Sequence, residues 1–207
     1  MRLSVGAKLL GGFEFVVLMA IVLGVVGMSS LAAMNELAIQ LYNRDLIGLQ
    51  DIGQARAAFD SYRLANAQAL AASNPTERNL QASRQASAEA AFVQALAAIQ
   101  SAADTADSGT LSGQLATTWN QYKSISDQVT ATANAGNVAD AIKISQTTGR
   151  DREEAVSGLL GQLNDMRSRI ATDQARQGMQ TYERVRILTV GLLIATLLIG
   201  VGMALWL

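Results

Sequence analysis

The sequence has 207 residues, of which 50% are apolar and 16% are charged, whereas a soluble domain usually carries about 25% charged residues. The absence of His and Cys excludes imidazole and thiolate metal sites, Ser-His-Asp triads, thiol catalysis and disulfides. Sixteen basic residues against 17 acidic ones leave no positive excess for nucleic acid. We therefore expect no cofactor, no metal, no enzyme activity and no nucleic-acid partner, but contact with a lipid bilayer.

Two apolar stretches frame the chain. Residues 15–35 and 187–207 carry no charged side chain, and about 20 apolar residues cross a bilayer as a helix. Between them lie 14 of the 16 basic and 16 of the 17 acidic residues. We predict a cytoplasmic N-terminus at 1–8, transmembrane helices at 9–30 and 187–207, and a soluble domain at 31–186.

Charges beside the spans predict the topology. Arg2 and Lys8 precede the first span and favour a cytoplasmic N-terminus, whereas Arg184 and Arg186 before the second span argue the other way. We prefer both ends inside, with Trp206 as an aromatic anchor at the inner interface. The chain then crosses the membrane twice, and its middle segment is exported.

The N-terminus has a second interpretation. A basic start, an apolar stretch and small residues at positions 29, 30, 32 and 33 are also typical of a cleaved signal peptide. Helical periodicity continues through 29–33, which favours a retained helix. Glu14 is the one charge inside the first span, and it lies near the cytoplasmic end, where a carboxylate costs less.

The middle of the chain is predicted to be helical, because it is rich in Ala, Leu, Gln, Glu and Arg and the whole chain has one Pro. Turn residues occur at 73–76, 105–110 and 135–137, with Thr76 and Asn137 as expected N-caps. The expected helices are 9–73, 76–104, 110–134 and 137–207, the last with a kink near 147–149. Short turns make this an all-α, antiparallel up-down-up-down four-helix bundle whose outer helices continue into the membrane.

Heptad spacing predicts which side chains face the bundle interior. The expected core positions are Leu49, Ile52, Arg56, Phe59, Arg63, Asn66 and Leu70 on the first helix, Phe92, Leu96, Ile99 and Ala103 on the second, Leu111, Leu115, Thr118, Tyr122, Ile125, Val129 and Thr132 on the third, and Val156, Leu159, Leu163, Met166 and Ile170 on the fourth.

Several segments of the chain form a recurring pattern: Lys8-Leu9-Leu10, Gly24-Val25-Val26-Gly27-Met28, Tyr42-Asn43-Arg44-Asp45-Leu46, Gly136-Asn137 and Tyr182-Glu183-Arg184. With this pattern the chain resembles the sensory half of bacterial methyl-accepting chemotaxis receptors with a four-helix-bundle ligand-binding domain. The resemblance implies a homodimer in a bacterial inner membrane, with residues 31–186 as a periplasmic sensor domain. It also implies a HAMP-type linker and signalling hairpin after Leu207 that reach kinase-coupling proteins. On this view the chain is the input module of a truncated receptor. Similar modules also precede histidine kinases and cyclic-dinucleotide enzymes.

One layer of the bundle combines polar and cationic residues at a similar distance from the turns. A guanidinium with nearby hydroxyls suits a small carboxylate, such as an organic acid or amino acid. The predicted ligand-binding residues are Arg63, Arg84, Ser87, Thr118, Tyr122, Thr147 and Arg150, with Trp119, Lys123 and Thr148 in the same layer.

Structural roles compete with these assignments. Arg63 is equally suited to pair with Asp60, Glu89 or Asp127, Trp119 is suited to the core, and Arg150 belongs to a mixed-charge run. In aspartate-sensing relatives, arginines on the first helix of both protomers grip the ligand, and only Arg63 resembles that set. A different carboxylate, bound within one protomer, therefore agrees with the sequence at least as well as aspartate bound between two protomers. The alternative function of another class is a membrane-anchored structural protein that binds no ligand.

Overall fold

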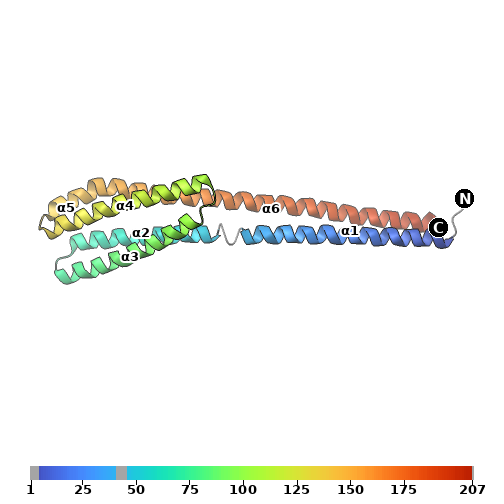
Figure 1. Ribbon diagram of the computed structural model, residues 1–207, viewed down its shortest axis with the longest axis horizontal. Coiled ribbons are helices and arrows are strands. Elements are labelled where there is room, and N and C mark those ends of the chain that lie inside the picture. The colour runs from blue at the N-terminus through green and yellow to red at the C-terminus, as the bar shows by residue number, and fades with distance from the viewer. Residues whose placement is uncertain (1–4, 41–45, 207) are drawn as a thin grey trace. The chain divides into compact units, whose positions relative to one another are not determined.

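The computed structural model describes residues 5–40 and 46–206; for 5–9, 40 and 203–206 only the backbone is described. The helices are α1 (Val5–Gln40), α2 (Ile47–Ala71), α3 (Pro75–Ser101), α4 (Ala106–Asn134), α5 (Val138–Ile144) and α6 (Arg150–Trp206), with a π-helical turn at Ser145–Gly149 (Figure 1). No strand occurs in these ranges. The expected all-α class is confirmed.

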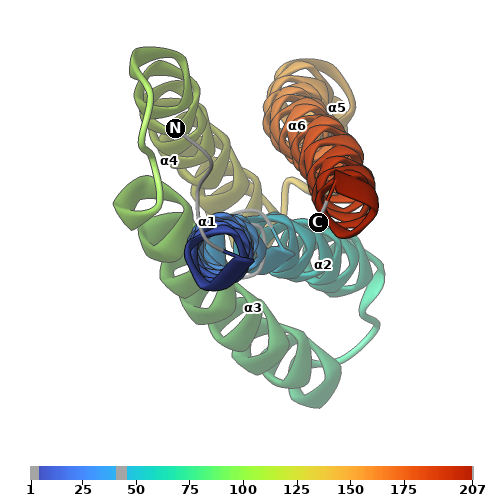
Figure 2. The same cartoon turned by 90° about the vertical axis from the view of Figure 1, so that its right-hand side faces the viewer.

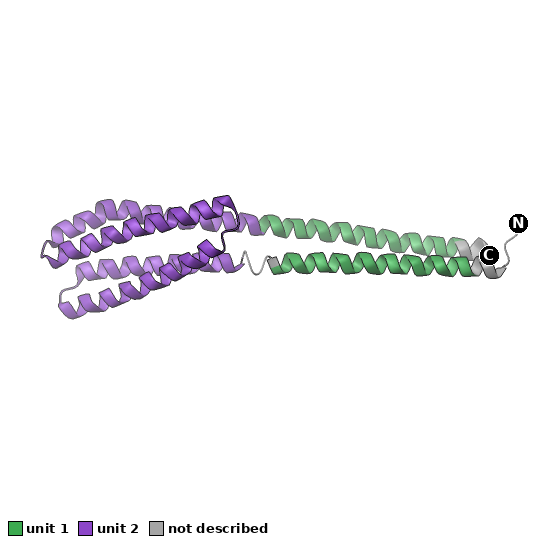
Figure 3. Cartoon of the chain, viewed as in Figure 1, with its two compact units in different colours: residues 1–41, 172–207 green, residues 42–171 purple. Residues whose placement is uncertain are grey.

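The chain divides into two compact units (Figure 3). One consists of residues 1–41 and 172–207, and the other of residues 42–171. Two stretches contain a strongly apolar segment of 18 residues: the mean hydropathy is 2.5 for the segment within Leu10–Ile39 and 2.2 for the segment within Val138–Gly202. No residue of either segment is buried. Within the described residues, two helices are thus long and apolar enough to cross a membrane.

The second unit is an antiparallel four-helix bundle. α2 lies beside α3, and α4 lies beside α5 (Figures 1 and 2). The fourth helix position is filled by α5, the π-helical turn and the first part of α6. Apolar side chains from α2, α3, α4 and α6 form one continuous core.

The first turn differs from its prediction at the cap. Asn74, not Thr76, is the N-cap of α3: its backbone is extended and its side-chain oxygen accepts a hydrogen bond from the Glu77 N–H at 2.9 Å. Pro75 follows at the first helical position, where a residue without an N–H is tolerated. The helix therefore begins one residue earlier than expected.

The second turn is shorter than predicted, because α4 begins at Ala106 and not at 110. Thr105 and Ser108 form a reciprocal capping box, in which each side chain accepts a hydrogen bond from the other residue's backbone N–H at 3.1 Å. At the third turn, Gly136 has φ +88°, a backbone conformation that favours glycine. Asn137 is the N-cap residue of α5, as predicted, although its side chain makes no capping hydrogen bond.

The expected irregularity in the last helix is confirmed as a π-helical turn at Ser145–Gly149. Gly149 is buried there, and a Cβ at this position would lie 3.3 Å from the Ile144 carbonyl oxygen. The wider π turn brings a backbone oxygen close to residue 149, which suits glycine.

The core face of α2 is rotated from the predicted seam. Ile52, Phe59 and Asn66 are buried as expected, but Arg56 is exposed and Arg63 is half-buried. Ala55 and Tyr62 take the inward positions instead, at 0% and 1% exposure. This rotation avoids the cost of burying two guanidinium groups without full pairing.

On the other helices, the predicted core positions that are buried are Phe92, Leu96, Ile99, Leu115, Tyr122, Val129, Val156 and Leu163. The predicted Leu111, Thr118, Ile125, Leu159 and Met166 are only half-buried, and the next residues, Ser112, Trp119, Ser126, Leu160 and Arg167, are buried instead. Three expectations concern parts outside the described residues: the continuity of a helix from 9 to 73 across 41–45, the Tyr42–Asp45 segment, and the Trp206 side chain.

Candidate functional site

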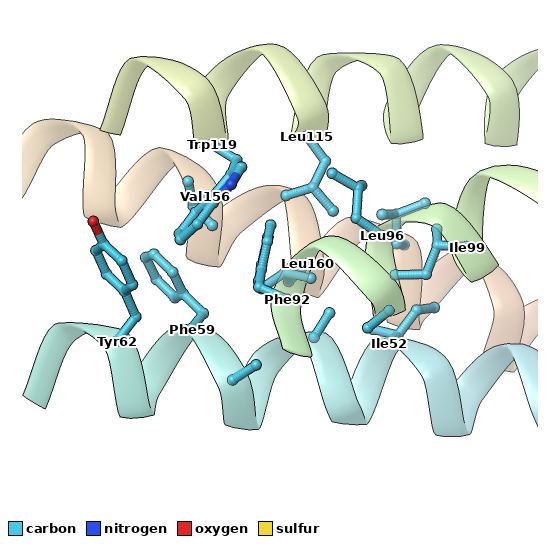
Figure 4. Packing of buried hydrophobic residues seen from close by; sticks show 14 of the residues in the cluster. Ile52, Phe59, Tyr62, Phe92, Leu96, Ile99, Leu115, Trp119, Val156 and Leu160 are labelled. Atoms are coloured by element: carbon cyan, nitrogen blue, oxygen red, sulfur yellow. The ribbon is translucent and has the colours of Figure 1, made fainter. Parts of the chain in front are cut away.

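Five of the chain's ten aromatic side chains gather in the middle of the bundle. Figure 4 shows Phe59, Tyr62, Phe92 and Trp119 of this cluster. Phe92 stacks on Trp119 with ring centroids 4.1 Å apart, and Phe59 meets Tyr122 edge-on at 5.3 Å. Tyr62 contacts Trp119 at 5.0 Å. These rings join α2, α3 and α4. Trp119 is a buried core residue, which agrees with the core role predicted for it as an alternative to a place in the ligand-binding layer.

Arg63 lies at the edge of this aromatic cluster. Its guanidinium carbon is 5.7 Å from the centre of the Phe59 ring, a cation-π distance. Its Nη1 lies 3.1 Å from Asp60 Oδ1, and its Nη2 pairs with Glu153 Oε1 on α6. Of the three predicted partners only Asp60 pairs with Arg63. The pair with Glu153 ties α2 to α6, and both terminal nitrogens of Arg63 are engaged by carboxylates of the chain itself.

Lys123 pairs with Glu89 and Asp127, the other two acidic residues predicted as partners of Arg63. Its Nζ lies 3.4 Å from Asp127 Oδ2 and 3.4 Å from Glu89 Oε1. The negative charges of these carboxylates raise the pKa of the Lys123 ammonium above its ordinary value, and Asp127 has the larger effect. The pair with Glu89 links α4 to α3, so Lys123 serves the packing of the bundle.

The two core tyrosines are held in their neutral form. Burial raises the pKa of Tyr122 well above its ordinary value, and the nearby Glu153 carboxylate adds to the rise. Burial also raises the pKa of Tyr62, although hydrogen bonds from Ser126 and Gln85 oppose it. Both phenols are therefore hydrogen-bonding groups and not anions at neutral pH.

Replacing Tyr122 with Phe is expected to reduce the alkaline loss of stability. A tyrosine with a raised folded-state pKa contributes stability below the unfolded pKa of about 10, and this contribution is lost as the pH rises above that value. Each such group adds up to about 1.4 kcal/mol per pH unit to the fall. Urea unfolding at pH 9 and pH 11, followed by near-UV circular dichroism, measures it; an unchanged pH dependence in Tyr122→Phe would contradict it.

Arg84 and Ser87 border a groove between α2 and α3. The groove has a volume of about 760 Å³ and is lined mostly by Ala, Ser and Gln, with no acidic side chain. Arg84 is exposed and forms no ion pair within the described ranges. The Ser61 and Ser87 hydroxyls donate to the Ala57 and Ser83 carbonyls at 2.8 and 3.0 Å. Arg84 and the side-chain amides are therefore the polar groups that the groove offers, and a guanidinium suits a carboxylate.

The remaining predicted residues lie outside this groove. Thr147 is exposed and donates a hydrogen bond to the Lys143 carbonyl at 2.8 Å. Arg150 is exposed and pairs with Glu154 at 3.1 Å. Thr118 is half-buried on α4. The predicted layer therefore separates into a groove with Arg84 and Ser87, an Arg63–Glu153 pair beside Tyr122, and surface residues.

One important residue was missed from the sequence. Arg167 on α6 is 4% exposed; its Nη2 donates to the Ala102 carbonyl at the end of α3, and its Nη1 lies 3.5 Å from Asp104 Oδ1. The signal was present, since Arg167 continues the buried spacing of Val156, Leu160 and Leu163 in steps of three and four. Elsewhere, no cluster of three or more acidic ligands for a metal occurs among the residues that the structure describes.

The antiparallel bundle, its cationic groove and the two apolar helices define a class of helical-bundle modules with membrane-compatible ends. Residues 2–182 match the family model described as a four helix bundle sensory module for signal transduction. The chain belongs to this family, which confirms the resemblance to the sensory half of chemotaxis receptors. No curated protein and no solved structure matches the chain.

Proposed function

We propose that this chain is the input module of a transmembrane chemoreceptor. As a homodimer in a bacterial inner membrane, it binds a small periplasmic carboxylate, an organic acid or an amino acid. It then passes a conformational signal through α6 to a cytoplasmic signalling part. Family membership supports the sensory role, and the two apolar helices support the membrane setting.

Helix α6 is the observation that carries this proposal. It runs as one helix from Arg150 to Trp206. Its first part contributes Val156, Leu160 and Leu163 to the bundle core, and its residues 187–202 are apolar. Displacements of about 1–2 Å at helix interfaces are a known switching mode. A shift of α6 in the bundle is therefore transmitted along a continuous helix to its apolar part.

The groove at Arg84 supports an anionic ligand. A guanidinium binds a carboxylate with two parallel hydrogen bonds, and the Ser87 hydroxyl lies along the same wall. No lining carboxylate competes for Arg84, in contrast to Arg63, which Glu153 already occupies. The ligand shifts the receptor only by its different affinity for the two states of α6.

Arg84→Met is expected to weaken binding of the cognate carboxylate at least tenfold, because a charge-assisted bidentate contact is lost. Calorimetry of the full chain in lipid nanodiscs, at fixed pH against a panel of organic acids and amino acids, measures this. Arg56→Met is the matched control, since Arg56 is exposed on α2 and does not line the groove.

Undiminished binding in Arg84→Met would place the ligand away from this groove. A flat response of the unaltered chain across the whole panel would favour a structural protein that binds no small molecule.

A further inference from the structure

Arg167 is the last buried side chain in the described part of α6. The buried positions of this helix are Val156, Leu160, Leu163 and Arg167, and no side chain between 168 and 202 is buried. The bundle unit ends shortly afterwards, at residue 171. Arg167 is therefore the final position at which α6 is buried in the bundle before the helix continues towards its apolar part.

The contact at Arg167 is directional, unlike the apolar contacts that precede it on α6. Nη2 donates a hydrogen bond to the Ala102 carbonyl, and Nη1 lies 3.5 Å from Asp104 Oδ1. Apolar contacts depend on buried area and have no preferred direction. A hydrogen bond, in contrast, needs a donor–acceptor distance of about 2.7–3.2 Å and weakens steeply at poor angles. The apolar side chains of α6 thus tolerate a small slide of the helix, whereas the Arg167 contact does not.

The turn that Arg167 contacts is itself held in place. Ala102 is the C-cap of α3, and the last turn of α3 contains no basic residue. Carbonyls at a helix C-terminus lack intrahelical donors and are stabilised by a nearby cation, so Arg167 supplies this cation from α6. On the other side of the turn, the Thr105–Ser108 capping box fixes the start of α4. The guanidinium therefore binds a well-defined turn.

The guanidinium is buried but not fully paired. Its Nη1 has no hydrogen-bond acceptor in the described structure, although Asp104 lies within ion-pair distance. Gly48 of α2 leaves space beside the group, since a Cβ at this position would lie 3.5 Å from Arg167 Nε. Buried polar and ionic groups are best known for fixing the register of packed helices. Such a contact defines one position of α6 and can still open, because few bonds hold the cation.

We propose that Arg167, the Ala102 carbonyl and Asp104 form a latch, the Arg167 latch, which holds α6 in one axial register and opens when α6 shifts. Displacements of about 1–2 Å at helix interfaces are a known switching mode, and a slide of this size takes Nη2 out of hydrogen-bonding range. The latch thus separates a closed from an open register of α6. Its regulatory role rests on the proposed function: the ratio of the two registers sets the output of the receptor without ligand.

Spin-label distances in the full chain in lipid nanodiscs test the latch without a ligand or a kinase. The chain has no Cys, so Gln128→Cys on α4 and Asp165→Cys on α6, both at exposed positions, carry the labels. Gln128 lies near the end of α4, whereas Asp165 lies beside Arg167, which contacts the turn before α4. An axial slide of α6 therefore changes the distance between the labels, which pulsed electron paramagnetic resonance measures.

The unaltered chain is expected to give a single narrow distance distribution. Arg167→Met is expected to add a second population displaced by about 1–2 Å. The loss of a charge-assisted hydrogen bond is expected to change the ratio of the two registers at least tenfold.

Leu160→Ala and Arg169→Met are the matched controls. Leu160 is 1% exposed, so its truncation lowers stability but keeps the latch. Arg169 is exposed, so its variant removes a positive charge of α6 outside the latch. Neither variant is expected to displace the distance. Asp104→Asn removes the ion pair but keeps the hydrogen bond to Ala102, and it is expected to give the second population in a smaller fraction.

The outcomes decide the latch in each case. An unchanged distance in a folded Arg167→Met variant would overturn it, and so would an equal displacement in Leu160→Ala. If circular dichroism shows that Arg167→Met is unfolded, Asp104→Asn takes its place, and an unchanged distance there would overturn the latch.

A chimera with the kinase-controlling part of a chemoreceptor tests the regulatory role. Arg167→Met is expected to change the ligand-free kinase activity several-fold, and Leu160→Ala is expected to leave it unchanged. A displaced distance with unchanged activity, in a chimera whose unaltered form controls the kinase, would overturn the regulatory role. A chimera that does not control the kinase would contradict the proposed function, while the label distances would still decide the latch.

Discussion

Phe92→Ala is expected to destabilise the bundle by about 3–5 kcal/mol, the usual cost of removing a buried aromatic side chain. Phe92 is 0% exposed, stacks on Trp119 with ring centroids 4.1 Å apart, and lies 6.1 Å from the Phe59 ring. Its removal costs apolar burial and leaves a cavity between α2, α3 and α4. Urea unfolding followed by near-UV circular dichroism, which reports on these rings, measures the loss.

The neighbouring Val93 provides the matched control. It lies on the same helix but is 49% exposed, so Val93→Ala is expected to change stability by less than about 0.5 kcal/mol. A loss below about 1 kcal/mol in Phe92→Ala would show that this aromatic cluster is not the centre of the core.

Arg167→Met is expected to destabilise the bundle by about 2–3 kcal/mol. The variant keeps most of the apolar stem but removes the charged hydrogen bond to the Ala102 carbonyl and the ion pair with Asp104. The Ala102 carbonyl at the end of α3 then loses its charged hydrogen-bond donor, and α6 loses its ion pair with Asp104 in the α3–α4 turn. Chemical unfolding of the full chain gives the difference in the free energy of unfolding.

Arg169 on α6 separates this effect from a general loss of positive charge. Its side chain is exposed, so Arg169→Met is expected to change stability by less than about 0.5 kcal/mol. Equal effects of the two variants would contradict the role assigned to Arg167.

The helix content and the turn positions could be predicted because composition, Gly and Pro act locally. The caps at Asn74 and Thr105 were harder to predict, since Thr76 also has a side chain suited to capping and residues 105–110 contain several such side chains. The structure selects Asn74 because Pro75 occupies the first helical position after it, and Thr105 because Ser108 completes the capping box.

The candidate site could be predicted only in part. Counting residues from the turns gives a residue's height in the bundle, but not the direction in which it faces. Arg63 and Arg84 were therefore assigned to one layer, whereas Arg63 pairs with Glu153 of α6 and Arg84 borders the groove between α2 and α3. The rotation of α2 that places Tyr62 inward and Arg63 at the edge depends on packing against three other helices, which no single helix pattern contains.

The central claim is that ligand binding in the bundle is transmitted through α6 as a continuous helix. Its most direct test joins residue 207 to the kinase-controlling part of a chemoreceptor and inserts four glycines, or four alanines as control, between Gly178 and Met179. Four residues add about one turn, so the alanines keep the helix nearly in phase, whereas the glycines break it. The ligand-dependent change in kinase activity is measured together with calorimetric binding. We expect both variants to bind the ligand, the alanine variant to respond and the glycine variant to lose the response; an equal response from both would contradict the account.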